Sequence, residues 1–307
     1  MAILNVVDVE GVVLKTGTNV HANGVEEQVA VIAIIRGYRH IGDNRETVKI
    51  DQPIVMSRNP KIKAKMVEWK YNMAVRVTGI VSTRLVNKPH RCPDCGNLGL
   101  EKGVTIYIEP IYVENKYMLE TKENALSFLN DIREISNRVF IEGDICREPK
   151  MIRPKKKLIV TQYQLAIDRK YTVREDDPSI RKDFPWVKSY GQNAIVDKER
   201  IHLGTSVTID GCLQARSINR HATCPTCGTV YDWMDRALEI VPYETEYNSN
   251  FYSDREVAEI KQRRREEILR NSKLSQFIVN EDTINNNYDE ITDDDVEAGY
   301  DNMENED

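Results

Sequence analysis

The motif Cys-Pro-x-Cys-Gly occurs twice in this sequence, and the spacing between its two copies constrains the fold more than any other feature. The copies read His-Arg-Cys-Pro-Asp-Cys-Gly at 90–96 and Cys-Pro-Thr-Cys-Gly at 224–228. Equivalent cysteines are 132 residues apart, and the same offset relates Gly11 to Gly143 and Gly79 to Gly211. Landmarks that share one long period indicate two copies of one domain, each with this turn at an equivalent place.

Length and cysteine use agree with two domains. The 307 residues, 40% of them apolar, suffice for two cores and connecting segments. No run approaches the roughly 18 apolar residues of a membrane span, and the first residues do not resemble a secretory signal. We expect a soluble cytoplasmic protein, at the nucleoid or a viral replication site. Six cysteines, four of them in Cys-x-x-Cys pairs, favour metal binding over a disulfide framework.

The first copy has the residue pattern of a small β-barrel. Valines cluster around Gly11, alternation follows at Val29–Ile35 and Met73–Val81, and a last β-rich run spans Val104–Val113. A short helical stretch at 60–69 precedes the fourth of five strand-like segments. This order predicts a closed barrel rather than a βαβ sheet.

Two helices and a tail complete the predicted architecture. Thr121 can cap a helix that connects the copies, and Ser253 with Glu256 can form the capping box of a second helix. The basic run of that second helix, 261–265, suits either a solvated face or a nucleic-acid contact. We divide the chain into a first barrel (1–114), a helical connector (115–136), a second barrel (137–247), a C-terminal helix (248–279) and a disordered tail (280–307).

The net charge of −6 averages two unlike regions. Residues 281–307 contain 12 acidic and no basic side chains, so the body carries about +6 and the tail −12. A mildly basic body can bind a polyanion. An acidic tail can compete for the same surface or recruit basic partner proteins.

The second copy resembles a known family in four segments that occur in the family's order. They are Asn137-Arg-Val-Phe-Ile-Glu-Gly-Asp-Ile-Cys-Arg-Glu-Pro-Lys-Met-Ile-Arg153, Gln164–Lys170, Lys188–Ala194 and Gly204–Ser217. They resemble the bacterial single-stranded DNA-binding proteins and their primosomal relative. The resemblance covers most of 137–218 and implies an oligonucleotide-binding (OB) fold. Together with the internal repeat it predicts an all-β protein of two tandem OB-fold barrels.

This sequence also departs from the family pattern. The first copy has no counterpart of the aromatic run at 184–190, because its residues 52–58 read Gln-Pro-Ile-Val-Met-Ser-Arg. The family lacks Cys-x-x-Cys pairs before its last strand, and its tail ends in an acidic-Pro-Phe tip that is absent here. The partner that reads the family's tip is therefore not implied for this chain.

An aromatic and basic row in the second copy suits single-stranded nucleic acid, which presents flat bases and a line of phosphates. Phe184, Trp186, Lys188 and Tyr190 have the same parity, so in a strand they point to one side. Aromatics at alternate positions also form barrel cores. Lysine is rarely buried unless paired, so the row is expected to face solvent, with Val187 in the core. The preceding strand would add Arg169, Lys170 and Tyr171.

Several arginines are candidates for phosphate contact, and each could equally be a solvated surface charge. They are Arg36, Arg39, Arg58, Arg84, Arg216 and Arg220. Phosphate contacts would make affinity fall steeply with salt through counterion release.

The two Cys-Pro-x-Cys-Gly turns predict a structural zinc site, which needs four ligands. Three solutions are open: both turns meet around one zinc, each turn recruits His90 or His221 and a further ligand, or the turns pair between subunits. We favour the first solution, with ligands Cys92, Cys95, Cys224 and Cys227. A redox Cys-x-x-Cys is disfavoured because no βαβ unit is predicted.

No catalytic motif is evident, so we expect a non-enzyme. The sequence favours a protein that coats single-stranded DNA during replication, recombination or repair. It leaves open assembly into a homo-oligomer. The alternative is an OB-fold and zinc module that binds protein within a replication or transcription complex.

Overall fold

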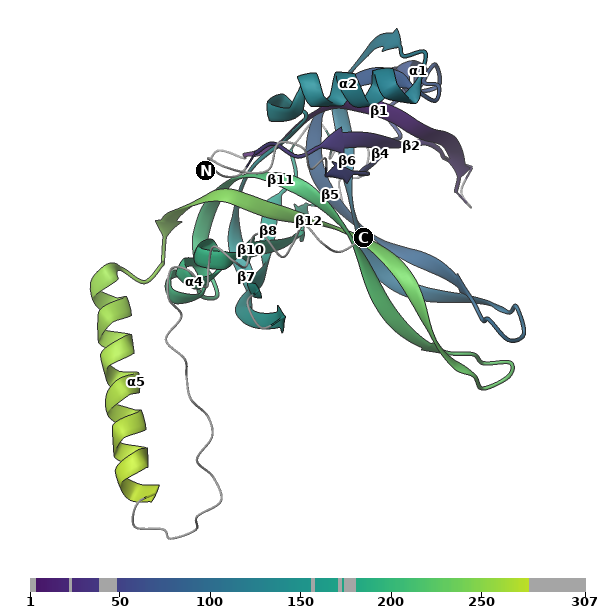
Figure 1. The fold of residues 1–307 in the computed structure, drawn as a ribbon. Coiled ribbons are helices and arrows are strands. Elements are labelled where there is room, and N and C mark those ends of the chain that lie inside the picture. Colours follow the sequence, from purple (N-terminus) through teal and green to yellow (C-terminus); the bar gives the residue numbers. More distant parts are fainter. Residues whose placement is uncertain are drawn as a thin grey trace.

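The chain forms one twelve-stranded sheet that closes on itself twice, giving two barrels joined side by side (Figure 1). This computed structural model describes residues 4–21, 24–38, 49–155, 158–170, 173 and 181–275. The all-β class and the two barrels are as predicted. The tail predicted at 280–307 lies outside the described residues.

The first barrel closes through the strand order β1-β2-β4-β6-β5-β1. Only the pairing of β4 with β6 is parallel among its neighbours. A two-residue strand, β3, extends β2 at one edge. The strands are β1 (Asn5–Val20), β2 (Glu26–Ile35), β3 (Ile50–Asp51), β4 (Ile54–Ser57), β5 (Met73–Arg91) and β6 (Leu98–Met118).

The second barrel repeats this topology through the order β7-β8-β10-β12-β11-β7, and again only the fourth-type pairing, β10 with β12, is parallel. The short β9 extends β8, as β3 extends β2. The strands are β7 (Asn137–Lys155), β8 (Leu158–Asp168), β9 (Lys182–Asp183), β10 (Trp186–Tyr190), β11 (Ser206–Thr223) and β12 (Val230–Ser249).

Antiparallel pairing of β1 with β7 joins the barrels, from Asn5 opposite Ile141 to Val9 opposite Asn137. The two asparagines have the same task. Asn5 exchanges two hydrogen bonds with the backbone of Val81, and Asn137 does so with Leu213. Both pairs differ by the 132-residue offset, so the repeat seen in the sequence is also a repeat of buried contacts.

Glycine is required where β5 and β11 cross their partner strands. A Cβ on Gly79 would lie 2.4 Å from the carbonyl oxygen of Glu109, and a Cβ on Gly211 would lie 2.4 Å from that of Val241. Real side chains do not tolerate such approaches to backbone. A β-bulge begins at each glycine, opposite a proline, and lets the strand bend around its barrel.

Two long ribbons leave the barrels and run side by side (Figure 1). We call the outer parts of β5 and β6, residues 83–106, arm 1, and those of β11 and β12, residues 215–238, arm 2. Each ends in one of the Cys-Pro-x-Cys-Gly turns. The arms pack on each other through a buried ion pair of Lys88 Nζ with Asp235, 2.7 Å, and the stacked rings of His90 and Trp233.

The helices are α1 (Pro60–Met66), α2 (Lys122–Asp131), α4 (Gly191–Arg200), α5 (Asp254–Ser275) and the short 3-10 helix η1 (Arg133–Ile135). Three of them lie where the sequence predicts helices, and α4 was not predicted. Thr121 caps α2 as expected, and α2 packs on the first barrel through Phe128 and Leu129. None of the described helices is long and apolar enough to cross a membrane.

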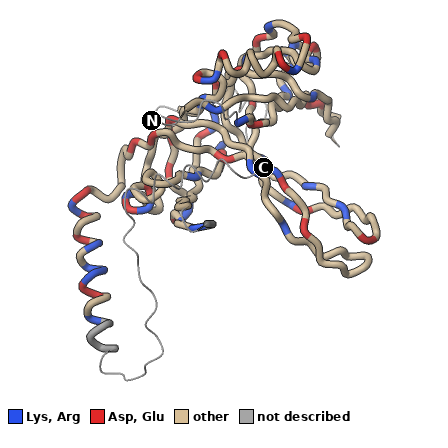
Figure 2. The backbone as a smooth tube through the Cα atoms, in the orientation of Figure 1, with Lys and Arg blue, Asp and Glu red and all other residues tan. Residues whose placement is uncertain are grey.

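Helix α5 projects from the second barrel and carries both signs of charge along its length (Figures 1 and 2). The predicted capping box is present, because the Ser253 backbone N–H donates to Glu256 and the Glu256 N–H donates back to the Ser253 hydroxyl. Beyond its first turns the described side chains are exposed. The basic run of this helix is therefore solvated.

Candidate nucleic-acid interface and metal centre

The predicted aromatic and basic row lies along β10, at the mouth of the second barrel. Its outer members are accessible: Phe184 is 42% exposed and Trp186 is half-buried. The guanidinium of Arg147, on the neighbouring β7, lies 5.6 Å from the centre of the Trp186 ring. These three side chains combine two flat platforms with a cation. Arg147 was missed as a site residue, because only the tertiary pairing of strands reveals its place.

The inner members of the row are buried, which corrects the expectation that Lys188 would face solvent. Lys188 pairs with the carboxylate of Glu239 at 2.9 Å, and the Tyr190 hydroxyl donates to the same carboxylate at 2.8 Å. Burial lowers the pKa of Lys188, and the charge of Glu239 offsets part of that shift. Lysine is buried here because it has a buried partner. Val187 is fully buried, as expected.

Arg169 was expected to contact phosphate but is 3% exposed and belongs to the junction between the barrels. It donates through two nitrogens to Asp183, at 2.8 and 2.7 Å. Asp183 also accepts from the backbone N–H of Thr83 at 2.6 Å, across the junction. Burial would lower the pKa of Arg169, but these bonds to Asp183 raise it above its usual value.

Arg36 forms the mirror-image junction and is likewise no free phosphate ligand. It donates to Asp51 at 2.6 and 2.9 Å, and Asp51 accepts from the backbone N–H of Ala215 in the other barrel at 2.7 Å. Asp51 and Asp183 differ by the 132-residue offset, as do Thr83 and Ala215. We call these two sets the junction clamps. The offset between the aspartates was the sequence signal that could have found them.

Two predicted arginines on the first barrel share a buried carboxylate. Arg58 and Arg84 pair with Glu27 at 3.3 and 2.8 Å, and the Arg84 guanidinium lies 5.5 Å from the ring centre of Tyr107. Glu27 is 3% exposed, whereas both arginines keep part of their side chains in solvent. The first barrel thus presents cations at its surface but no exposed aromatic row.

The remaining predicted contacts fall into three groups. Arg216 is accessible, with a 3.7 Å ion pair to Glu239, and Lys170 is half-buried. Arg220 is held between the arms by Asp235 at 2.7 Å. The last group, Arg39 and Tyr171, lies outside the described residues. Accessible candidates therefore concentrate on the second barrel around Trp186.

The four cysteines of the two turns meet at the ends of the arms. Cys92 Sγ lies 3.6 Å from Cys227 Sγ, and Cys95 Sγ lies 3.5 Å from Cys224 Sγ. All four sulfurs lie within 4.8 Å of one another and could hold a metal ion. Neither His90 nor His221 belongs to this group. The geometry is that of the first of the three solutions, in which both turns contribute to one site.

The turns repeat each other bond for bond. The backbone N–H of Gly96 donates to the Cys92 carbonyl at 3.0 Å, and Gly228 donates to Cys224 at 2.9 Å. Both glycines have positive φ, 69° and 76°, where a side chain would be strained. Each turn therefore presents its two sulfurs in the same orientation.

The electrostatics of the cluster suit a bound cation. Backbone N–H groups, led by that of Cys227, lower the pKa of Cys224 to about 6. The Asn97 N–H has the same effect on Cys95, but the neighbouring sulfurs outweigh it and raise the pKa of Cys95 to about 12. Four thiolates this close repel one another, and a metal ion would remove that repulsion.

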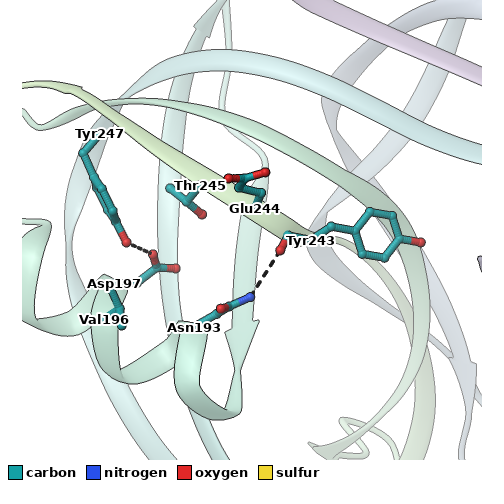
Figure 3. Close-up of a pocket in the computed structure, with 7 residues that line it drawn as sticks. All are labelled: Asn193, Val196, Asp197, Tyr243, Glu244, Thr245 and Tyr247. Carbon is teal, nitrogen blue, oxygen red and sulfur yellow. Dashed lines mark hydrogen bonds between the residues drawn. The ribbon is translucent and has the colours of Figure 1, made fainter. Parts of the chain in front are cut away.

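A pocket of about 350 Å³ lies elsewhere, between α4 and β12 (Figure 3). At its base is Asp197, which is 1% exposed and accepts from the hydroxyls of Tyr247 at 2.7 Å and Tyr163 at 3.2 Å. Burial raises the pKa of Asp197. These bonds attach α4 to the barrel, so the aspartate serves the fold and not the strand-binding row.

Comparison with known proteins agrees with the geometry of the second barrel. Residues 136–224 match the single-strand binding protein family. No curated protein sequence matches the chain. The matched segment contains β7 to β11 and the whole aromatic row. The second barrel is therefore an OB fold of the single-strand binding type, and its family is one of binding proteins, in keeping with the expected lack of enzymatic activity.

Solved structures extend the likeness of fold to both barrels. The single-stranded DNA binding protein from Thermus aquaticus is 12% identical and superposes with a TM-score of 0.51, over 83% of this chain and 97% of that chain. A deletion mutant of the same protein gives 14% identity and a TM-score of 0.49, over 83% and 99%. The first superposition shows a shared fold.

Proposed function

From the match of residues 136–224 to the single-strand binding protein family, we propose that this chain binds single-stranded DNA, chiefly through its second barrel. The observation that carries the proposal is the exposed pair of platforms, Phe184 and Trp186, with Arg147 against the Trp186 ring. Stacking of a base on an aromatic side chain contributes about 1–3 kcal/mol. Two such platforms and a cation suffice for a sequence-tolerant site.

Coating of exposed single strands during replication, recombination or repair is the role that such a site serves. The chain brings two barrels together in a fixed arrangement through the β1–β7 pairing and the junction clamps. A strand that leaves the second barrel would therefore meet the cations of the first, Arg58 and Arg84, at a constant distance. Assembly into a homo-oligomer would lengthen that path.

The ion at the ends of the arms is proposed to be a structural zinc. For tetrahedral zinc with Zn–S bonds of about 2.3 Å, the sulfurs are about 3.8 Å apart. The two short separations here, 3.6 and 3.5 Å, agree with that spacing. Four thiolates leave no open position for substrate, so the metal would join the arms and take no part in chemistry. One zinc per chain is expected.

The acidic segment 281–307 is proposed to act in exchange. Twelve carboxylates tethered to a body of about +6 can compete with phosphates for the strand-binding surface. Abundant DNA would displace the segment, which would then be free to recruit basic replication or recombination proteins.

Titration with fluorescent oligo-dT and oligo-rU at two salt concentrations tests strand binding. Trp186→Ala should weaken oligo-dT binding by about 1–3 kcal/mol, because it removes a stacking platform. Tyr112→Ala is the matched control: Tyr112 is 51% exposed and also lies under a cation, Lys65 at 5.2 Å, but on the first barrel beside α1. Equal affinities for the two folded variants and the native chain would refute the proposed site.

A further inference from the structure

The inner faces of the two arms are covered, so attention falls on their outer faces. Strand register shows which side chains point outward on arm 1, because residues on the face opposite Lys88 and His90 share the other parity. Cross-strand pairs there are Leu85 with Val104, Asn87 with Lys102, Pro89 with Leu100, and Arg91 with Leu98. All eight residues are exposed.

This outer face of arm 1 is mainly aliphatic. Leu85 is 63% exposed, Leu100 61%, Leu98 53% and Val104 48%. Together with Pro89 they form one continuous apolar stripe of a few hundred Å² along the ribbon, a size at which exposed patches tend to be interaction sites.

The fold does not require this stripe, because arm 2 has the same backbone and different chemistry. At the offset of 132 residues, Leu85, Leu100 and Val104 correspond to Ser217, Asp232 and Arg236. Their cross-strand register is the same, Ser217 opposite Arg236. Only Leu98 has an apolar counterpart, Val230. Arm 1 therefore exposes apolar side chains at positions where its sister arm is polar.

Charge and shape indicate what the stripe receives. The outward positions of arm 1, all described, include two cations, Arg91 and Lys102, and no acidic group. They include no aromatic ring, so they lack the platforms on which nucleobases stack. The area is also below the roughly 800 Å² per partner of a stable dimer. An aliphatic stripe rimmed by cations fits a short protein segment with apolar side chains on one side and carboxylates beside them.

We propose that the outer face of arm 1 is a docking site for a partner protein that presents an acidic amphipathic segment in extended conformation. Apolar side chains of the segment pack on Leu85, Leu100 and Val104. Its carboxylates pair with Arg91 and Lys102. The site is separate from the strand-binding row of β10, so the chain can hold a partner and a strand together.

The test uses the full chain and labelled peptides. One short peptide alternates leucine with glutamate, and a second alternates leucine with lysine. The triple variant Leu85→Ser, Leu100→Asp, Val104→Arg gives arm 1 the residues that arm 2 already carries, so the ribbon is expected to fold. Met234→Ser, on the outer face of arm 2 where Met234 is 65% exposed, is the matched control. Metal content and circular dichroism verify folding.

The acidic peptide should bind the native chain and the Met234→Ser control alike, and the triple variant at least about tenfold more weakly. Arg91→Glu with Lys102→Glu, which keeps the stripe, should reverse the preference toward the lysine peptide. Equal binding by native chain and triple variant would overturn the proposal. So would a triple variant that loses oligo-dT affinity instead, or a native chain that sediments as a dimer while the triple variant is monomeric.

Discussion

Asp183→Ala should destabilise the protein strongly, because it opens one junction clamp. Asp183 is fully buried, and its removal leaves the charge of Arg169 and the backbone N–H of Thr83 without their principal partner. Breaking a buried ion pair from one side costs about 3–5 kcal/mol. Glu109 lies 3.8 Å from the Arg169 guanidinium and compensates in part. We therefore expect a loss near the lower limit, about 3 kcal/mol.

Urea unfolding at pH 7 measures this loss as a shift in the midpoint at unchanged slope. Asp168→Ala is the control, since Asp168 pairs with Lys182 one residue away on the same two strands. Those side chains are 56% and 48% exposed and 3.4 Å apart, so their pair should contribute no more than about 1 kcal/mol. If both substitutions cost the same small amount, the clamp does not hold the barrels together and the reasoning fails.

Three further predictions concern the metal, a buried acid and the tail. Elemental analysis should find one zinc per chain and none in the Cys224→Ser, Cys227→Ser variant; two zincs per chain would exclude the shared site. The raised pKa of Asp197 means that its contribution to stability is present below the unfolded pKa of about 4 and is lost as pH rises through the folded pKa. Asp197→Asn lacks this loss, so its stability relative to the native chain should increase over that window, and a constant difference would argue against a buried, ionising Asp197. Deletion of 281–307 should tighten oligo-dT binding at low salt, with the gain shrinking as salt rises; no difference at low salt would exclude competition.

Much of the fold could be predicted because the repeat marks positions with strict requirements. Gly79 and Gly211 lie where no Cβ fits, and the four cysteines lie in turns of identical geometry. The length of the arms could not be predicted. Alternation continues unchanged as a strand leaves its barrel, so residues 83–91 read like any other half-buried strand.

The candidate site was less predictable because partners decide what a charged side chain does. Arg169 and Arg36 were candidate phosphate ligands until folding placed Asp183 and Asp51 beside them. Parity correctly grouped the aromatic row on one side of β10, but not its depth, because Glu239 comes from a strand about 50 residues further along the chain. Local pattern specifies direction, whereas burial is a property of the closed barrel.

Photo-crosslinking tests the central claim most directly. An oligo-dT strand carrying bromodeoxyuridine, irradiated on the full chain and mapped by mass spectrometry, reports which side chains lie against the bases. The account predicts crosslinks at Trp186 and Phe184, competed by unlabelled oligo-dT. Competed crosslinks confined to other accessible aromatics, such as Tyr112 or Trp233, would contradict it.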